Sequence, residues 1–146
     1  ETRYYLNGIY LHKAEEGDLC AVATDGHRLA LTRQALPSGA SQMPSIILPR
    51  KAVGELRKLI DDYDGEVSVG LSETRAEFGF GAVRLTSKLI DGTFPDYTRV
   101  IPAGNDRIMQ VDAAFFLRVK AKNVSGGIVV LGSRKSAIQR GPNHWW

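Results

Sequence analysis

The sequence predicts an α+β domain, mostly antiparallel sheet with one or two helices packed on one face. Apolar residues alternate with period two over several short segments, which is typical of half-buried strands. One segment instead repeats its apolar residues every three or four positions, which is the spacing of an amphipathic helix. Turns rich in glycine and aspartate separate these segments, as expected for strands joined by hairpins.

The first predicted unit contains three strands, at residues 3–11, 19–24 and 28–33. Residues 3–11 are rich in aromatic and β-branched side chains, which pack well on a pleated surface. The other two strands flank Asp25-Gly26, a dipeptide that favours a tight hairpin. Cys20 lies in an apolar run, so we expect a buried thiol, and as the only cysteine it excludes an internal disulfide.

A short strand at Ser45–Leu48 and a helix over about residues 50–61 open the second predicted unit. Pro49 can start this helix because its missing N–H falls among the unpaired donors of the first turn. The apolar residues of the helix should form one stripe against a core. This stripe comprises Val53, Leu56, Leu59 and Ile60.

Three more strands are predicted after the helix, at residues 66–71, 74–80 and 82–89. Each alternates with period two, so each should bury one face. The residues expected on the buried faces are Val67, Val69, Leu71, Ala76, Phe78, Phe80, Val83 and Leu85. Three strands followed by strand, helix and three strands form a weak repeat of architecture.

The segment from Asp91 to Asp106 has turn chemistry and precedes a predicted strand at Arg107–Val111 and a helix starting near Asp112. We expect this strand to pair with the open edge of the unit at 3–33. The helix would cover that unit through Ala113, Phe116 and Val119. The long connection permits docking within one chain or in a swapped dimer.

The composition supports one globular domain, because 146 residues that are 43% hydrophobic can bury one sizeable core. The sequence contains no apolar run of membrane-spanning length and no recognisable secretion leader, so a cytoplasmic protein without a membrane partner is expected. Residues 1–100 hold 12 Lys/Arg against 14 Asp/Glu, whereas residues 101–146 hold 7 against 2. This basic end predicts either a solvated extension or a nucleic-acid contact.

Residues that could perform catalysis are sparse. The three histidines, at positions 12, 27 and 144, have no metal-ligand spacing, and a single cysteine cannot build a thiolate site. The GFG at 79–81 lacks the third glycine and the helix that a phosphate-binding loop needs. Asp25 and His27 lie on one turn with no evident nucleophile beside them. We therefore predict no catalytic residue, no metal and no cofactor.

Four stretches of the sequence point to a known family. RYYLNG (3–8), ATDGHRLA (23–30), LPRKAVGELRKLI (48–60) and SKLIDGTFPDY (87–97) together resemble the middle domain of the bacterial DNA sliding clamp, the β subunit of DNA polymerase III. The resemblance implies a processivity-fold domain of two strand-helix-three-strand units, in a non-catalytic ring around duplex DNA. It also implies a pocket that binds short linear peptides of the replicative DNA polymerase and the clamp loader.

The same resemblance implies which residues bind. The turn after Asp25-Gly26 would form one wall of the pocket, with an apolar slot and a few orienting polar groups. The predicted peptide-binding residues are Leu6, Thr24, Gly26, His27, Arg28, Leu29, Pro95, Arg99 and Val100. The predicted DNA-binding residues are Arg3, Tyr4 and Tyr5, which suit phosphate contact and base stacking. A plain β-turn with a solvated histidine and arginine is the alternative interpretation of this turn.

The resemblance also divides the chain. Residues 1–100 resemble a clamp middle domain without its first strand and helix, and residues 101–116 resemble the start of the third domain. Residues 117–146 are a divergent basic tail, either native or an out-of-frame ending. An incomplete clamp domain of this kind should retain only part of the peptide pocket. The alternatives are a nucleic-acid-binding protein that acts through the basic tail, and a non-functional fragment that folds by homo-oligomerising.

Overall fold

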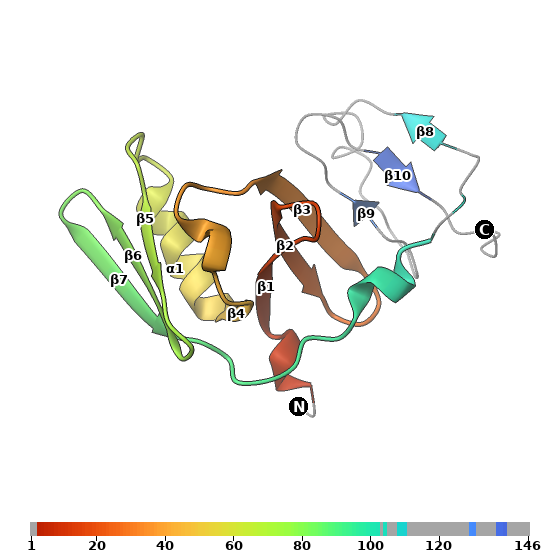
Figure 1. The fold of residues 1–146 in the computed structure, drawn as a ribbon, viewed down its shortest axis with the longest axis horizontal. Helices are drawn as coiled ribbons and strands as arrows, with labels where there is room; N and C mark the ends of the chain where they lie inside the picture. Colours follow the sequence, from red (N-terminus) through yellow and green to blue (C-terminus); the bar gives the residue numbers. More distant parts are fainter. Residues whose placement is uncertain (1–2, 103, 105–107, 111–128, 131–136, 140–146) are drawn as a thin grey trace. The chain divides into compact units, whose positions relative to one another are not determined.

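The computed structural model describes residues 3–102, 104, 108–110, 129–130 and 137–139, and their strands form three antiparallel sheets (Figure 1). The first sheet has the order β3-β2-β1-β4, the second β5-β6-β7 and the third β8-β10-β9. The strands are β1 (Gly8–Lys13), β2 (Asp18–Thr24), β3 (Leu29–Ala35), β4 (Ile46–Pro49), β5 (Ser68–Leu71), β6 (Arg75–Phe80), β7 (Val83–Lys88), β8 (Ile108–Gln110), β9 (Val129–Val130) and β10 (Ala137–Gln139).

One α-helix and three short 3-10 helices accompany the sheets in the described residues: α1 (Arg50–Ile60), η1 (Tyr4–Leu6), η2 (Ala40–Gln42) and η3 (Tyr97–Val100). The chain forms two compact units, one of residues 1–21 and 34–94 and the other of residues 22–33 and 95–146. The predicted class, antiparallel sheet with a helix packed on it, is confirmed. No helix in the part of the chain described here is long and apolar enough to cross a membrane.

The first compact unit is built around a crossover pairing between β1 and β4. The register places Gly8 opposite Pro49 and Leu11 opposite Ile46. The Arg50 N–H then donates to the Asn7 carbonyl oxygen (3.0 Å), where β4 runs directly into α1. Pro49 is the last residue of β4 and the N-cap of α1, one position before the predicted helix start.

The core of this unit lies between β4, α1 and β6. Its buried members are Leu48, Ala52, Ala76, Phe78 and Phe80. Half-buried side chains pack around them, including Val53, Leu56, Ile60, Tyr63, Leu71 and Leu85. The predicted docking of the helix stripe is therefore confirmed for three of its four residues, whereas Leu59 is exposed.

The prediction that each of the three strands at 66–89 buries one face is confirmed for the middle strand and in part for the outer two, where Leu71 and Leu85 pack against the core. Val69 lies opposite Phe78 in the register, and Val83 lies opposite Phe80, so both share the core face of the sheet. Val69 is nevertheless 53% exposed and Val83 43% exposed. The buried helix residue Ala52 clusters with the side chains of β6, and a single helix does not cover the flanking valines of β5 and β7.

The predicted strand at residues 3–11 is wrong in its first half. Residues Tyr4–Leu6 form η1, with Leu6 N–H donating to Arg3 oxygen and Asn7 N–H donating to Tyr4 oxygen, both at 3.0 Å. The strand begins only at Gly8, because β4 ends opposite that residue and the chain then turns into α1. Residues 3–7 therefore have no β4 partner.

The predicted pairing of Arg107–Val111 with the first three strands is also wrong. The strand exists as β8, but it pairs with β10, with Met109 opposite Ile138. The edge of β1 is instead occupied by β4. The helix predicted from Asp112, and its residues Ala113, Phe116 and Val119, lie outside the described residues.

Candidate functional site: the β2–β3 turn

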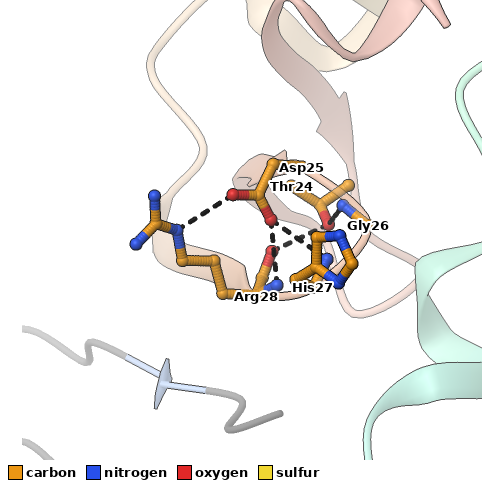
Figure 2. A network of polar contacts seen from close by, with 5 residues as sticks. All are labelled: Thr24, Asp25, Gly26, His27 and Arg28. Carbon is orange, nitrogen blue, oxygen red and sulfur yellow. Dashed lines mark hydrogen bonds and ion pairs between the residues drawn. The ribbon is translucent and has the colours of Figure 1, made fainter. Parts of the chain in front are cut away.

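The turn between β2 and β3 is held by a closed set of hydrogen bonds (Figure 2). Asp25 Oδ1 accepts from the N–H groups of His27 and Arg28, both at 3.0 Å. Thr24 Oγ1 accepts from the Gly26 N–H (3.1 Å) and donates to the Arg28 carbonyl oxygen (2.8 Å). The Asp25 N–H donates to the same carbonyl oxygen (3.4 Å). All four backbone donors of residues 25–28 are thus satisfied within the turn, which fixes its shape before any partner binds.

The sequence explains this geometry locally. Gly26 has φ of 87°, a left-handed conformation that glycine adopts without steric cost. Asp25 and Thr24 are residue types whose short side chains bond nearby backbone groups and so favour turns. The Asp-Gly motif therefore predicted the hairpin correctly, although the side-chain network goes beyond what the motif alone indicates.

The side chains of His27 and Arg28 are displayed rather than buried. Arg28 Nε lies 3.0 Å from Asp25 Oδ2, yet the Arg28 side chain is 80% exposed. The His27 ring and the Arg28 guanidinium point away from each other on opposite sides of the turn (Figure 2). The turn thus presents one cationic and one aromatic, hydrogen-bonding group on a fixed backbone.

The carboxyl group of Asp25 is electrostatically perturbed by its place in the turn. Hydrogen bonds from the backbone N–H groups of His27 and Arg28 lower the pKa of Asp25 below its ordinary value of 3.8, and the charge of Arg28 adds to the effect. The carboxylate form is favoured because the donors stabilise its charge.

We expect the turn to loosen in acid. A carboxyl whose pKa is lower in the folded chain contributes stability above its unfolded-state pKa and loses that contribution as pH falls through the folded-state pKa. The amide resonances of His27 and Arg28 should therefore shift together below about pH 4, as followed by NMR titration. Asp25→Asn keeps an oxygen acceptor but does not titrate, so it should abolish this transition. An Asp25 pKa at or above 3.8 would contradict the assignment.

The later predicted residues lie on and before η3, in the same compact unit as the turn. Asp96 caps η3 by accepting from the Thr98 N–H (3.2 Å), and Tyr97 is buried beneath it. This leaves Pro95, Arg99 and Val100 exposed, with Val100 at 58%. Figures 1 and 2 both show η3 beside the β2–β3 turn.

The remaining predicted peptide-binding residues are less accessible. Leu29 begins β3 and is only 3% exposed, so it packs beneath the turn. Thr24 is half-buried and bonded within the turn. Leu6 is half-buried in η1, in the first compact unit.

The three predicted DNA-contacting residues lie at η1. Arg3 and Tyr4 are exposed, whereas Tyr5 is half-buried. The rings of Tyr4 and Tyr5 meet edge to face with centroids 5.8 Å apart. Tyr5 packs against Gly92, where an added Cβ would come within 3.1 Å of the Tyr5 Cβ. One tyrosine is thus anchored and the other is displayed.

Sequence reasoning missed an aromatic groove in the first compact unit. Tyr10 stacks on Phe94 with ring centroids 4.7 Å apart and planes 8° from parallel. The two rings line a groove of about 550 Å³ together with Ile46, Ile47, Glu73, Thr74 and residues 89–93. Its parts come from four separate stretches, so no local motif indicates it. The described part of the chain holds no group of three or more His, Cys, Asp or Glu side chains placed to bind a metal.

Comparison with known proteins gives a consistent result. Residues 1–96 match the family model of the DNA polymerase III beta subunit, central domain. The chain is 50% identical over 121 residues to the beta sliding clamp of Caulobacter vibrioides, covering 81% of this chain and 32% of that one. It is 43% identical over 112 residues to the beta sliding clamp of Escherichia coli K12, covering 75% and 30%.

Solved structures agree with this result. The sliding clamp of Bartonella birtlesii bound to griselimycin shares 54% identity with a TM-score of 0.75, covering 84% of this chain and 35% of that one. The polymerase III beta subunit of Caulobacter crescentus shares 50% identity with a TM-score of 0.73, covering 81% and 33%. The chain therefore spans about a third of the length of the relatives it matches.

Proposed function

This chain belongs to the DNA polymerase III beta subunit family through its central domain, and from that membership we propose that it is a non-catalytic binding protein of bacterial DNA replication. Its ligands would be the linear peptides of the replicative polymerase and the clamp loader, in the cytoplasm. The binding surface would be formed by the β2–β3 turn and η3.

The observation that carries this proposal is the internally bonded turn. Because residues 25–28 already satisfy their own backbone donors, a ligand gains affinity without ordering the turn first. A peptide would meet exposed Pro95 and Val100 as an apolar wall and the His27 and Arg28 side chains as polar contacts. Buried Leu29 would support the wall from beneath rather than touch the ligand.

Peptide affinity should depend on apolar contact more than on charge. In a titration of a fluorescent peptide from a replicative polymerase, Val100→Asp should weaken binding about tenfold or more, because it places a charge in the apolar contact. Arg28→Ala should weaken it less, and raising the salt concentration should change affinity little because buried apolar contacts are not screened.

The matched control is Val83→Asp, which alters another exposed valine in β7, outside the proposed surface. Equal losses from Val100→Asp and Val83→Asp would contradict the proposal, as would a steep salt dependence. Griselimycin, which is bound to the Bartonella birtlesii clamp, provides a second probe. It should compete with the peptide if the two ligands share this surface.

Nucleic-acid binding is a second candidate function, favoured by the exposed Arg3 and Tyr4 and by the basic composition of residues 101–146. Such binding would release counterions from phosphates, so it should fall steeply with salt. It should also weaken when Tyr4 is replaced by Ala, because base stacking on the ring is lost. These two responses distinguish it from peptide binding in the same titration format.

A further inference from the structure

Asp96 holds η3 through a side-chain cap. Its Oδ1 accepts from the Thr98 N–H (3.2 Å) and from the Thr98 hydroxyl (2.5 Å). η3 has only four residues, and a 3-10 helix of this length is not stable on its own. Together with the buried Tyr97 ring, the cap therefore fixes the conformation of this turn.

The capped turn determines which side chains of η3 a ligand can reach. Tyr97 is 8% exposed, whereas the two residues at the end of the helix, Arg99 and Val100, are exposed. Successive side chains of a 3-10 helix are rotated by about 120°, since it has three residues per turn. A change in the backbone torsions of η3 would therefore move Arg99 and Val100 relative to the buried ring.

The β2–β3 turn, in the same compact unit, is held in the same way. Asp25 Oδ1 accepts from the backbone N–H two residues further on, as Asp96 Oδ1 does. Short acidic side chains commonly bond nearby backbone groups in this manner. In both segments an arginine follows the aspartate by three positions, Arg28 in one and Arg99 in the other. Both parts of the proposed binding surface are thus shaped by an aspartate side chain.

The two arginines differ in what the capping carboxylate does with them. Arg28 Nε lies 3.0 Å from Asp25 Oδ2, so that carboxylate both caps the turn and holds the guanidinium. Arg99 has no such ion pair with any residue that the structure describes. Asp96 therefore orients η3 while the charge of Arg99 stays available to a ligand.

We propose that Asp96 is a positioning residue for peptide binding, which acts through Arg99 and Val100 and does not touch the peptide itself. The inference rests on the proposed function. When η3 is already formed, the peptide does not have to order it, and less of the binding free energy is lost. The position of the Asp96 oxygen then matters to the peptide, and its charge does not.

Substitutions that separate geometry from charge test the proposal, in a titration of the fluorescent polymerase peptide with the full chain. Asp96→Ala removes the acceptor and should weaken peptide binding about tenfold. Asp96→Asn keeps an oxygen at the same position and should bind within about twofold of the unsubstituted chain, because asparagine caps as well as aspartate. Asp96→Glu keeps the charge but places the carboxylate one methylene further out. It should bind as weakly as Asp96→Ala.

Thr98→Val tests the same contact from the donor side. Valine has nearly the shape of threonine but lacks the hydroxyl group, so this change should weaken peptide binding about threefold. Combined with Asp96→Ala it should cause no further loss, because the hydroxyl has already lost its acceptor. Additive losses would mean that the two residues contribute separately, which overturns the proposal.

The local structure of η3 should change together with affinity. The amide resonances of Val100 and Ile101 should shift in Asp96→Ala and return in Asp96→Asn, as followed by NMR. The thermal transition should stay the same, because Asp96 lies outside the core formed by β4, α1 and β6. Asp61→Ala is the matched control, since Asp61 is an exposed aspartate at the C-terminal end of α1. It should leave peptide affinity unchanged.

Two results overturn the inference while the proposed function stands. One is binding by Asp96→Ala as tight as that of the unsubstituted chain. The other is recovery of binding in Asp96→Glu but not in Asp96→Asn, which would mean that the charge of Asp96 contacts the peptide directly. If the unsubstituted chain binds no peptide, the proposed function fails, and this inference fails with it.

Discussion

Replacing Phe78 by Ala should lower the free energy of unfolding by about 3–5 kcal/mol, the usual cost of removing a buried aromatic ring. Phe78 lies in the central strand β6, is 5% exposed, and contributes to the core that joins β4, α1 and β6. The loss would leave a cavity between a helix and two sheets that cannot easily collapse. Urea denaturation followed by circular dichroism measures it.

Val69→Ala is the matched control for Phe78→Ala. Val69 lies directly opposite Phe78 on the same face but is more than half exposed. Its truncation should cost less than about 1 kcal/mol. Similar costs for the two variants would mean that the core is not centred on β6.

Replacing Gly8 by Ala should be the second most damaging change, with a cost of about 3 kcal/mol, near the upper end of the range for overpacking. A Cβ at Gly8 would overlap the carbonyl oxygen of Leu48 in the neighbouring strand. The obstacle is backbone rather than a flexible side chain, so β1 and β4 must separate to accept it. Loss of amide protection at residues 46–49 would show this directly in hydrogen exchange.

Gly54→Ala provides a control of opposite sign. Gly54 lies inside α1, and an added Cβ there meets nothing within 4 Å. The substitution should raise the free energy of unfolding by about 0.5–1 kcal/mol, because alanine restricts the unfolded chain and favours the helix. If both glycine substitutions destabilise the chain equally, close approach of β4 is not the reason that residue 8 is glycine.

The predictions from sequence succeeded where residues close together in the chain determined the structure. The period-two pattern of residues 74–80 correctly identified Ala76, Phe78 and Phe80 as core. The same pattern misled at Val67, Val69 and Val83, because alternation predicts the face on which a side chain lies but not whether a helix covers it. Coverage depends on the width of the helix layer, which the strands' own sequence does not contain.

The ends of the strands and their pairing partners also show which features depend on local sequence and which do not. Residues 3–7 have strand-forming composition, yet they form η1 because β4 has ended opposite Gly8. β8 was predicted as a strand, but its partner β10 comes from a stretch of sequence with no recognisable pattern. Strand propensity is local, whereas the choice of partner is not.

The candidate site was predictable in part. Asp25-Gly26 indicated the turn, and the structure shows it with exposed His27 and Arg28. Leu29 was predicted to line the pocket, but it is buried. The alternation of β3 begins at this residue and points its side chain inward. The aromatic groove at Tyr10 and Phe94 was missed because its two rings are 84 positions apart in the sequence.

The pairing of β1 with β4 also has a consequence for synthesis on the ribosome. Residues 8–11 find their partners only at residues 46–49, so a loop of more than 30 residues must close before this ladder forms. Such long-range pairing slows folding relative to hairpin contacts. At bacterial elongation rates the partner strand is made about 2–8 s after β1. During that interval Gly8–Lys13 is an unpaired edge, and the speed of translation sets how long the nascent chain remains open to incorrect pairing.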